Sequence, residues 1–66
     1  MPNNLKELAA MIAERDGISL NEAQILVDET QEEMERAFYT GSLNEVEDIL
    51  ADYLGLEPDY MMLFIN

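Results

Sequence analysis

The 66-residue chain contains no cysteine, no histidine and no tryptophan. Without cysteine it can form no disulfide, and without cysteine or histidine it lacks the side chains that hold structural zinc. The same absences remove the commonest catalytic base and the strongest side-chain nucleophile, and no glycine-rich phosphate loop is present. We therefore expect no enzyme activity, no cofactor and no metal site.

Basic residues are also scarce, with three Lys and Arg against fifteen Asp and Glu, which gives a formal net charge of −12 at pH 7. Direct nucleic-acid binding needs cationic contacts to phosphates, so this balance argues against it and favours a basic protein partner. The longest apolar run, Tyr60 to Ile65, is far shorter than the roughly 18 residues of a membrane span. The N-terminus lacks the positive cluster of a signal peptide, so we expect a cytoplasmic protein with no membrane contact.

Hydrophobic residues, by contrast, make up 48% of the chain, which is typical of a folded protein. A chain of 66 residues forms one small domain, which we expect to span residues 1–66. Its core must be thin, because so short a chain buries only about 60% of its unfolded surface. Stability must then come from helix packing or from self-association.

Apolar residues at helical spacing predict two helices in the first part of the chain. A helix over about residues 4–16 follows from apolar positions at i, i+3, i+4 and i+7, and Gly17 favours its end. Ser19 and Glu22 form a capping-box pattern that begins a longer helix reaching about Phe38. The apolar stripe of this helix advances in steps of four and three residues through Ala23, Val27, Thr30, Met34 and Ala37.

The remaining chain predicts one further main helix and a short terminal one. Ser42 and Glu45 repeat the capping-box pattern, and the helix that follows ends at Gly55. Its apolar face is predicted to consist of Leu43, Val46, Leu50, Tyr53 and Leu54. Pro58 suits the first turn of a short helix through Tyr60 to Ile65, for which a strand is the alternative.

The predicted fold class is therefore all-α, a compact bundle of three main helices plus a short C-terminal helix. Loops of two to five residues are expected to connect the helices. The predicted core consists of Leu8, Ile12, Val27, Met34, Phe38, Val46, Leu50 and Leu54.

Carboxylates gather on the second and third predicted helices, on the faces opposite the apolar stripes. Like charges three or four residues apart repel by about 0.2–0.5 kcal/mol a pair, so this density carries a local cost. Ile25 lies in the middle of the acidic side, where an apolar group has no role in folding unless another element or a partner covers it. The predicted partner-binding residues are Ile25, Asp28, Glu32, Glu35, Glu45, Asp48 and Asp52.

Two functions fit this acidic surface. Carboxylates at i and i+4 on a helix stand about 6 Å apart and can reproduce a short stretch of backbone phosphate charge, which predicts a DNA mimic that inhibits or regulates a basic, nucleic-acid-binding protein. The alternative is that the charge only provides solubility and that the chain is a structural or assembly subunit.

The C-terminal apolar run favours self-association. Six consecutive apolar residues cannot all face one small core, and an exposed apolar patch often marks an interface. We therefore expect a homodimer, although the charge on each subunit opposes it. The predicted contact residues are Tyr60, Met61, Leu63, Phe64 and Ile65.

The tripeptide Gly-Ser-Leu at 41–43, followed by an acidic helix, is similar to the Asp-Ser-Leu attachment site of acyl carrier proteins, in which the serine bears phosphopantetheine. Here glycine stands where that family has aspartate, and too little chain follows Ser42 for the two further helices of that family. Ser42 also has a capping role beside Glu45. We therefore interpret Ser42 as a helix cap.

A broader resemblance covers about Asp16 to Phe64. The Ser-Leu-Asn-Glu cap, the long acidic helix and the segment DILADYLGLEPDY at 48–60 together resemble small acidic accessory proteins of bacterial phages and mobile elements. The resemblance implies a bacterial cytoplasmic setting and supplies no functional residues.

Overall fold

Helices make up nearly the whole of the structure, a computed structural model that describes residues 2–65. Their order is α1 (Leu5–Asp16), α2 (Leu20–Thr40), α3 (Leu43–Ile49), the π-helical turn η1 (Leu50–Leu54) that continues α3, and the 3₁₀-helix η2 (Pro58–Phe64). No strand occurs among the described residues. The predicted all-α fold of three main helices plus a short C-terminal one is confirmed.

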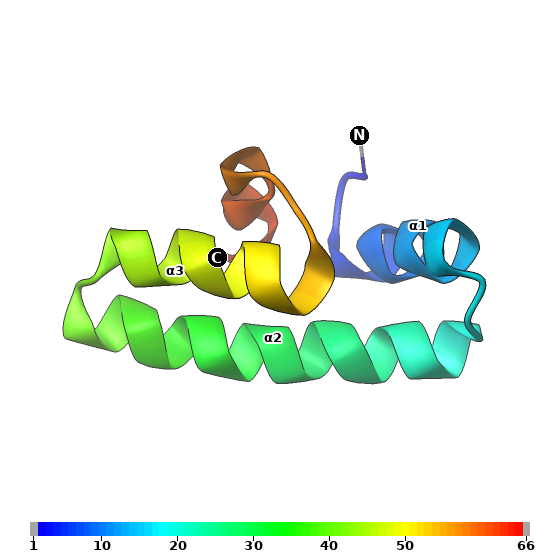
Figure 1. The fold of residues 1–66 in the computed structure, drawn as a ribbon, viewed down its shortest axis with the longest axis horizontal. Helices are drawn as coiled ribbons and strands as arrows, with labels where there is room; N and C mark the ends of the chain where they lie inside the picture. The colour runs from blue at the N-terminus through cyan, green and yellow to red at the C-terminus, as the bar shows by residue number, and fades with distance from the viewer. Residues whose placement is uncertain (1, 66) are drawn as a thin grey trace.

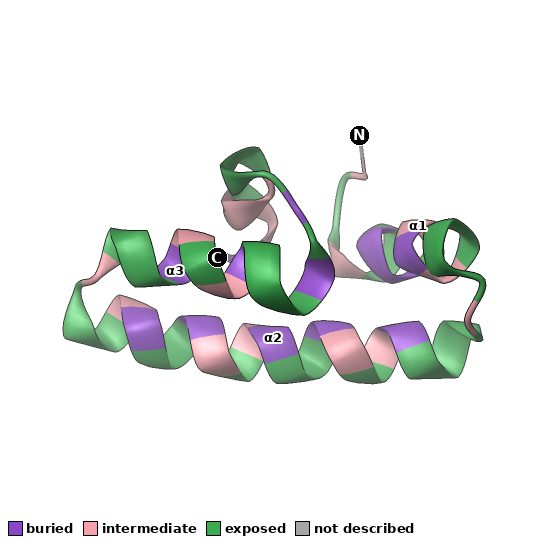
Figure 2. Cartoon of the chain, in the orientation of Figure 1, coloured by how far each residue is buried: buried purple, intermediate pink, exposed green. Residues whose placement is uncertain are grey.

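Helix α2 is the spine of the molecule (Figure 1). Its 21 residues extend roughly 31 Å at 1.5 Å per residue, close to the 33 Å long axis of the whole chain. Helix α1 packs against the first part of α2, and α3 with η1 runs back along the second part. Both lie on the same side of α2, as the buried residues along that side in Figure 2 show, and the opposite side is exposed.

Side chains cap the start of each main helix. The Asn4 side chain accepts a hydrogen bond from the Glu7 N–H at 2.9 Å, and Ser19 accepts one from the Glu22 N–H at 3.0 Å. Ser42 accepts one from the Glu45 N–H at 3.4 Å, so the predicted capping role of Ser42 is confirmed. Within residues 2–65 neither Glu22 nor Glu45 returns a bond to its serine N–H, so both capping boxes are only half formed.

Glycines in the left-handed conformation end α1, α2 and the continuous helix of α3 and η1. The end of η1 at Gly55 differs from the end of α1. Gly55 has φ of 63°, a region that only glycine occupies at little cost. The Leu56 N–H then reaches back to the Leu50 carbonyl at 3.2 Å, whereas at the end of α1 the Ile18 N–H bonds to the Ala13 carbonyl at 3.1 Å. The bond at Leu56 therefore spans one residue more, as expected after a π-helical turn.

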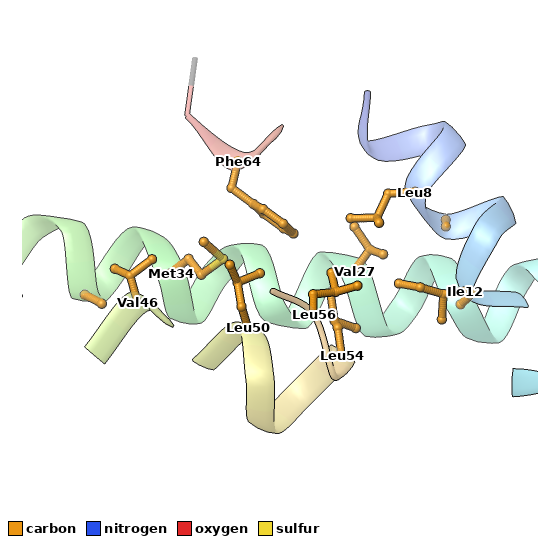
Figure 3. Packing of buried hydrophobic residues seen from close by; sticks show 12 residues of the cluster. Leu8, Ile12, Val27, Met34, Val46, Leu50, Leu54, Leu56 and Phe64 are labelled. Carbon is orange, nitrogen blue, oxygen red and sulfur yellow. The ribbon is translucent and has the colours of Figure 1, made fainter. Parts of the chain in front are cut away.

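One apolar cluster fills the space between α2 and the other elements (Figure 3). The buried apolar residues are Leu8, Ala9, Ile12, Ala23, Val27, Met34, Ala37, Val46, Leu50, Leu54, Leu56 and Phe64. The predicted core is confirmed except for Phe38, which is only half-buried at the edge of the cluster. Thr30 is fully buried with this stripe, and its hydroxyl donates to the Leu26 carbonyl at 2.7 Å.

The predicted apolar face of the third helix is wrong at two positions. Leu43 is 61% exposed because it lies in the first turn of α3, beyond the elements that cover the core. Tyr53 is 44% exposed because the π-helical turn inserts an extra residue and so rotates the chain away from α-helical register. Its hydroxyl donates instead to the Glu33 carboxylate at 3.4 Å.

The C-terminal tail divides its apolar residues between the core and the surface. The 3₁₀-helix η2 has three residues per turn, so successive side chains point to different sides of it. Phe64 is only 7% exposed, and Figure 3 shows its ring pointing into the core. Met62 and Ile65, by contrast, are 74% and 51% exposed. The strand alternative for this segment is wrong.

The Arg15 side chain connects the end of α1 to the end of η1 by a hydrogen bond. Its Nη2 atom donates to the Leu54 carbonyl at 2.7 Å, and its guanidinium also forms two hydrogen bonds, at 2.8 and 3.0 Å, with the Asp16 carboxylate. These bonds lower the pKa of Asp16 and raise that of Arg15. Residues distant in the sequence are thus connected at the surface by one cation.

Candidate protein-binding surface on helix α2

The side of α2 that faces away from the core carries a second regular stripe, which we call the outer stripe. It advances in steps of four and three residues and is formed by Asn21, Ile25, Asp28, Glu32, Glu35 and Tyr39. At 100° per residue these positions lie on one line, roughly opposite the buried stripe. All six residues are exposed, so no other part of residues 2–65 covers this line.

Two large apolar side chains bracket the carboxylates of the outer stripe. Ile25 is 57% exposed and Tyr39 is 95% exposed. They are separated along α2 by roughly 21 Å, and Asp28, Glu32 and Glu35 lie between them. The surface is therefore amphipathic, with acidic groups in the middle and an apolar group at each end.

Most of the negative charge of the molecule lies after residue 19, on α2 and on the elements that follow it. Residues 1–19 hold Lys6 and Arg15 against three acidic residues, whereas residues 20–66 hold Arg36 alone against twelve. Arg36 forms an ion pair with Glu33 at 3.0 Å, which draws it toward the flank of α2. Among the described residues neither Glu32 nor Glu35 has an ion-pair partner. Their charge is therefore available to a partner.

Two shallow hollows flank the C-terminal end of the outer stripe and share Glu35 and Tyr39 as their common wall. The first is lined by Glu32, Glu35, Arg36, Tyr39 and Thr40. The second, which we call the tail groove, lies between α2 and the end of the tail and is lined by Gln31, Glu35, Phe38, Tyr39, Phe64 and Ile65. The tail groove combines an aromatic and aliphatic lining with one carboxylate.

The acidic residues of α3 and η1 form a separate row. Glu45, Asp48 and Asp52 are exposed, as predicted for partner-binding residues. Glu45 lines a third hollow with Glu33, Arg36, Ala37, Thr40 and Ile49. Because Arg36 lines this hollow as well as the first one, a cation lies between the two acidic rows. Asp52 belongs to the π-helical turn, which removes it from the register that a continuous α-helix would give it.

The residues predicted for self-association are mostly engaged within their own chain. Tyr60, Met61 and Leu63 are half-buried against the core, and the Tyr60 hydroxyl lies 4.0 Å from the Met11 sulfur. Phe64 is a core residue and is not available as a contact surface in this conformation. Among the residues predicted for self-association, Ile65 is the one that is exposed.

Sequence reasoning missed Tyr39, the most exposed large apolar side chain of the described residues. The signal that could have found it is the heptad spacing of Ile25, Glu32 and Tyr39, which places all three on one face of a helix. Tyr39 lies one residue beyond Phe38, the end of the predicted helix, and so falls outside the predicted pattern.

No three acidic side chains within residues 2–65 are placed to hold a metal ion together. No helix in the same range is long and apolar enough to cross a membrane. Comparison of the chain with protein-family models, with curated proteins and with solved structures gives no match.

Proposed function

We propose that the chain is a protein-binding module that inhibits or regulates a basic protein, in particular one that binds nucleic acid. The observation that carries this proposal is the outer stripe, an uncovered helix face in which Ile25 and Tyr39 bracket three exposed carboxylates. Interfaces are enriched in aromatic residues, and Tyr39 is the most exposed large apolar side chain of the described residues. The proposed setting is the bacterial cytoplasm, where the chain acts as an accessory protein of a phage or mobile element.

Electrostatics supports a basic partner. A net charge of −12 on so small a chain creates a field that attracts cationic surfaces and repels nucleic acid. Such complementarity raises the association rate and excludes acidic partners. The partner's nucleic-acid site is the most cationic surface that a nucleic-acid-binding protein offers.

Mimicry of nucleic acid is the finer form of this proposal. Asp28, Glu32 and Glu35 form one row with neighbours about 6 Å apart, which resembles a line of backbone phosphates. The row on α2 is the better candidate, because Arg36 separates it from the acidic residues of α3. Only one row would then enter a nucleic-acid cleft.

The proposal is tested by affinity capture from host extract, identification of the captured protein, and titration of the purified pair. Binding should weaken steeply between low and moderate salt and should compete with DNA or RNA. Glu32→Lys should weaken binding more than Asp52→Lys, because only Glu32 belongs to the outer stripe. If the affinity does not depend on salt and neither charge reversal lowers it, recognition through the acidic surface is rejected.

Assembly through self-association is the second candidate, and the exposure of Met62 and Ile65 favours it. The apolar stripe of α2, however, is already covered by α1, α3 and η1 of the same chain. Sedimentation at several salt concentrations tests this candidate. A dimer that Ile65→Asp dissociates supports it, and a monomer at micromolar protein and moderate salt rejects it.

A further inference from the structure

We infer that the basic partner binds through an amphipathic α-helix that lies along the outer stripe and inserts a large apolar side chain into the tail groove. This inference rests on the proposed function and specifies the chemistry and shape of the partner. Its contact residues on this chain are Ile25, Glu32, Glu35, Tyr39 and Ile65.

The tail groove has the construction of an anchor site. Its walls come from two elements that are far apart in the sequence, with Tyr39 on α2 and Ile65 after η2. Phe38 and Phe64 also line it, and both pack on the core, so its aromatic surface is held in place by the fold. Tyr39 itself is 95% exposed and has almost no cover from its own chain. Tyr is among the residues that carry most binding energy when a partner buries them.

The charges around the groove select a cationic occupant. Glu35 is the only charged residue that lines the tail groove, and no Lys or Arg among the described residues does so. A second copy of this chain would bring another Glu35 and another acidic stripe to the same place, against a charge of −12 on each copy. A partner helix that carries an apolar side chain beside Lys or Arg covers the apolar lining of the groove with the first and neutralises the charge of Glu35 with the second.

The shape of the surface favours a helix over an extended segment. Strand addition requires an open sheet edge, and residues 2–65 contain no strand. The outer stripe is instead the ridge of a long helix, against which another helix packs at about 8–10 Å between axes. A partner helix that spans Ile25 to Tyr39 needs roughly 15 residues, with apolar side chains at its two ends and basic ones between them.

The test is an NMR titration of the ¹⁵N-labelled full chain with two synthetic probes at moderate salt. One probe is an 18-residue helical peptide whose contact face carries Leu near its two ends and Lys between them, and the other is an oligolysine of equal charge. The amphipathic probe should bind at least ten-fold more tightly and should shift the amide signals of Gln31, Tyr39 and Ile65. Oligolysine should produce only weak shifts spread over the acidic residues.

Variants separate this inference from the proposed function. Tyr39→Ala should weaken the amphipathic probe about ten-fold, whereas the matched control Tyr53→Ala should leave its affinity unchanged. Equal affinity for both probes, or no effect of Tyr39→Ala, overturns the inference even when Glu32→Lys still abolishes binding. Amphipathic binding that Glu32→Lys does not weaken overturns the proposed acidic recognition as well.

Discussion

The two faces of α2 follow the same spacing and have opposite surroundings. Both stripes advance in steps of four and three residues along one helix, but the stripe through Val27 and Met34 is fully buried, whereas the stripe through Ile25 and Tyr39 is exposed. Periodicity therefore identifies the faces of a helix, and residue chemistry decides which face the chain buries.

The covered stripe is suited to close packing. Ala23 lies at its first end and Ala37 at its second, and such small side chains let the neighbouring helices approach the spine. The larger Met34 fills the space nearer the middle. The outer stripe has the reverse arrangement, with its bulky residues at the ends and its charges in the middle. Of the two stripes of α2, the outer one therefore keeps large apolar side chains exposed.

The C-terminal tail also has a covered and an exposed side, because Phe64 is buried and its neighbour Ile65 is exposed. Phe64→Asp removes a buried ring and places a carboxylate among apolar side chains, so it should cost more than about 4 kcal/mol and unfold the chain. Ile65→Asp should retain the fold. Far-ultraviolet circular dichroism distinguishes the two results, and a folded Phe64→Asp variant would show that the tail does not complete the core.

A substitution on each stripe of α2 tests the comparison directly. Met34→Ala should lower the free energy of unfolding by about 2–5 kcal/mol, because it leaves a cavity at a fully buried position. Glu32→Ala, on the exposed stripe, should change it by less than about 0.5 kcal/mol. Urea unfolding measures both values, and equal losses would contradict the assignment of the two faces.

Arg15 lies at the surface and stabilises the covered side of α2 through its hydrogen bond to the Leu54 carbonyl. Arg15→Gln should cost about 1 kcal/mol through loss of the bond to the Leu54 carbonyl. The matched control is Arg36→Gln, which removes an exposed i,i+3 ion pair and should cost no more than a few tenths of a kcal/mol. Thermal unfolding of both variants checks this order, and an equal loss would mean that the bond to Leu54 contributes nothing.

The penalty of Arg15→Gln should also depend on pH. The bonds from Arg15 lower the pKa of Asp16 in the folded chain, so the ionised carboxylate stabilises the fold above its unfolded-state pKa of about 3.9. This contribution is lost as the pH falls through the lower folded-state pKa. The difference between wild type and Arg15→Gln should therefore be smaller at pH 3 than at pH 7, where unfolding experiments can compare it.

The smallest effect concerns repulsion within the outer stripe. Glu32 lies four residues from Asp28 and three from Glu35, so Glu32→Gln should raise the free energy of unfolding by a few tenths of a kcal/mol. Added salt should raise the stability of the wild type and shrink this gain, because it screens the same repulsion. A gain that persists at 1 M NaCl would point to a cause other than charge.

The elements with strong local signals could be predicted from the sequence. Caps at Ser19 and Ser42 and the glycine ends depend on interactions within a few residues, and the stripe of α2 is long enough for its period to be unambiguous. The carboxylates of the candidate site could be predicted to be exposed for the same reason.

What could not be predicted depends on contacts between distant parts of the chain. The π-helical turn exposes Tyr53, and no local pattern marks it. The burial of Phe64 depends on how the tail returns to α2, and the tail groove beside Tyr39 exists only once that return is made. The bond from Arg15 to Leu54 joins residues 39 positions apart.

The position of α2 as spine has a consequence for how the chain folds. Each of its main contacts is with the element before it or after it in the sequence, so few long loops must close before the core forms. Helical proteins with such local contacts fold in microseconds to milliseconds. Within residues 2–65 the hydrogen bonds between the most distant residues join Arg15 to Leu54 and Tyr60 to Met11. These should form last, so that a nearly complete helical core exists before the tail groove does.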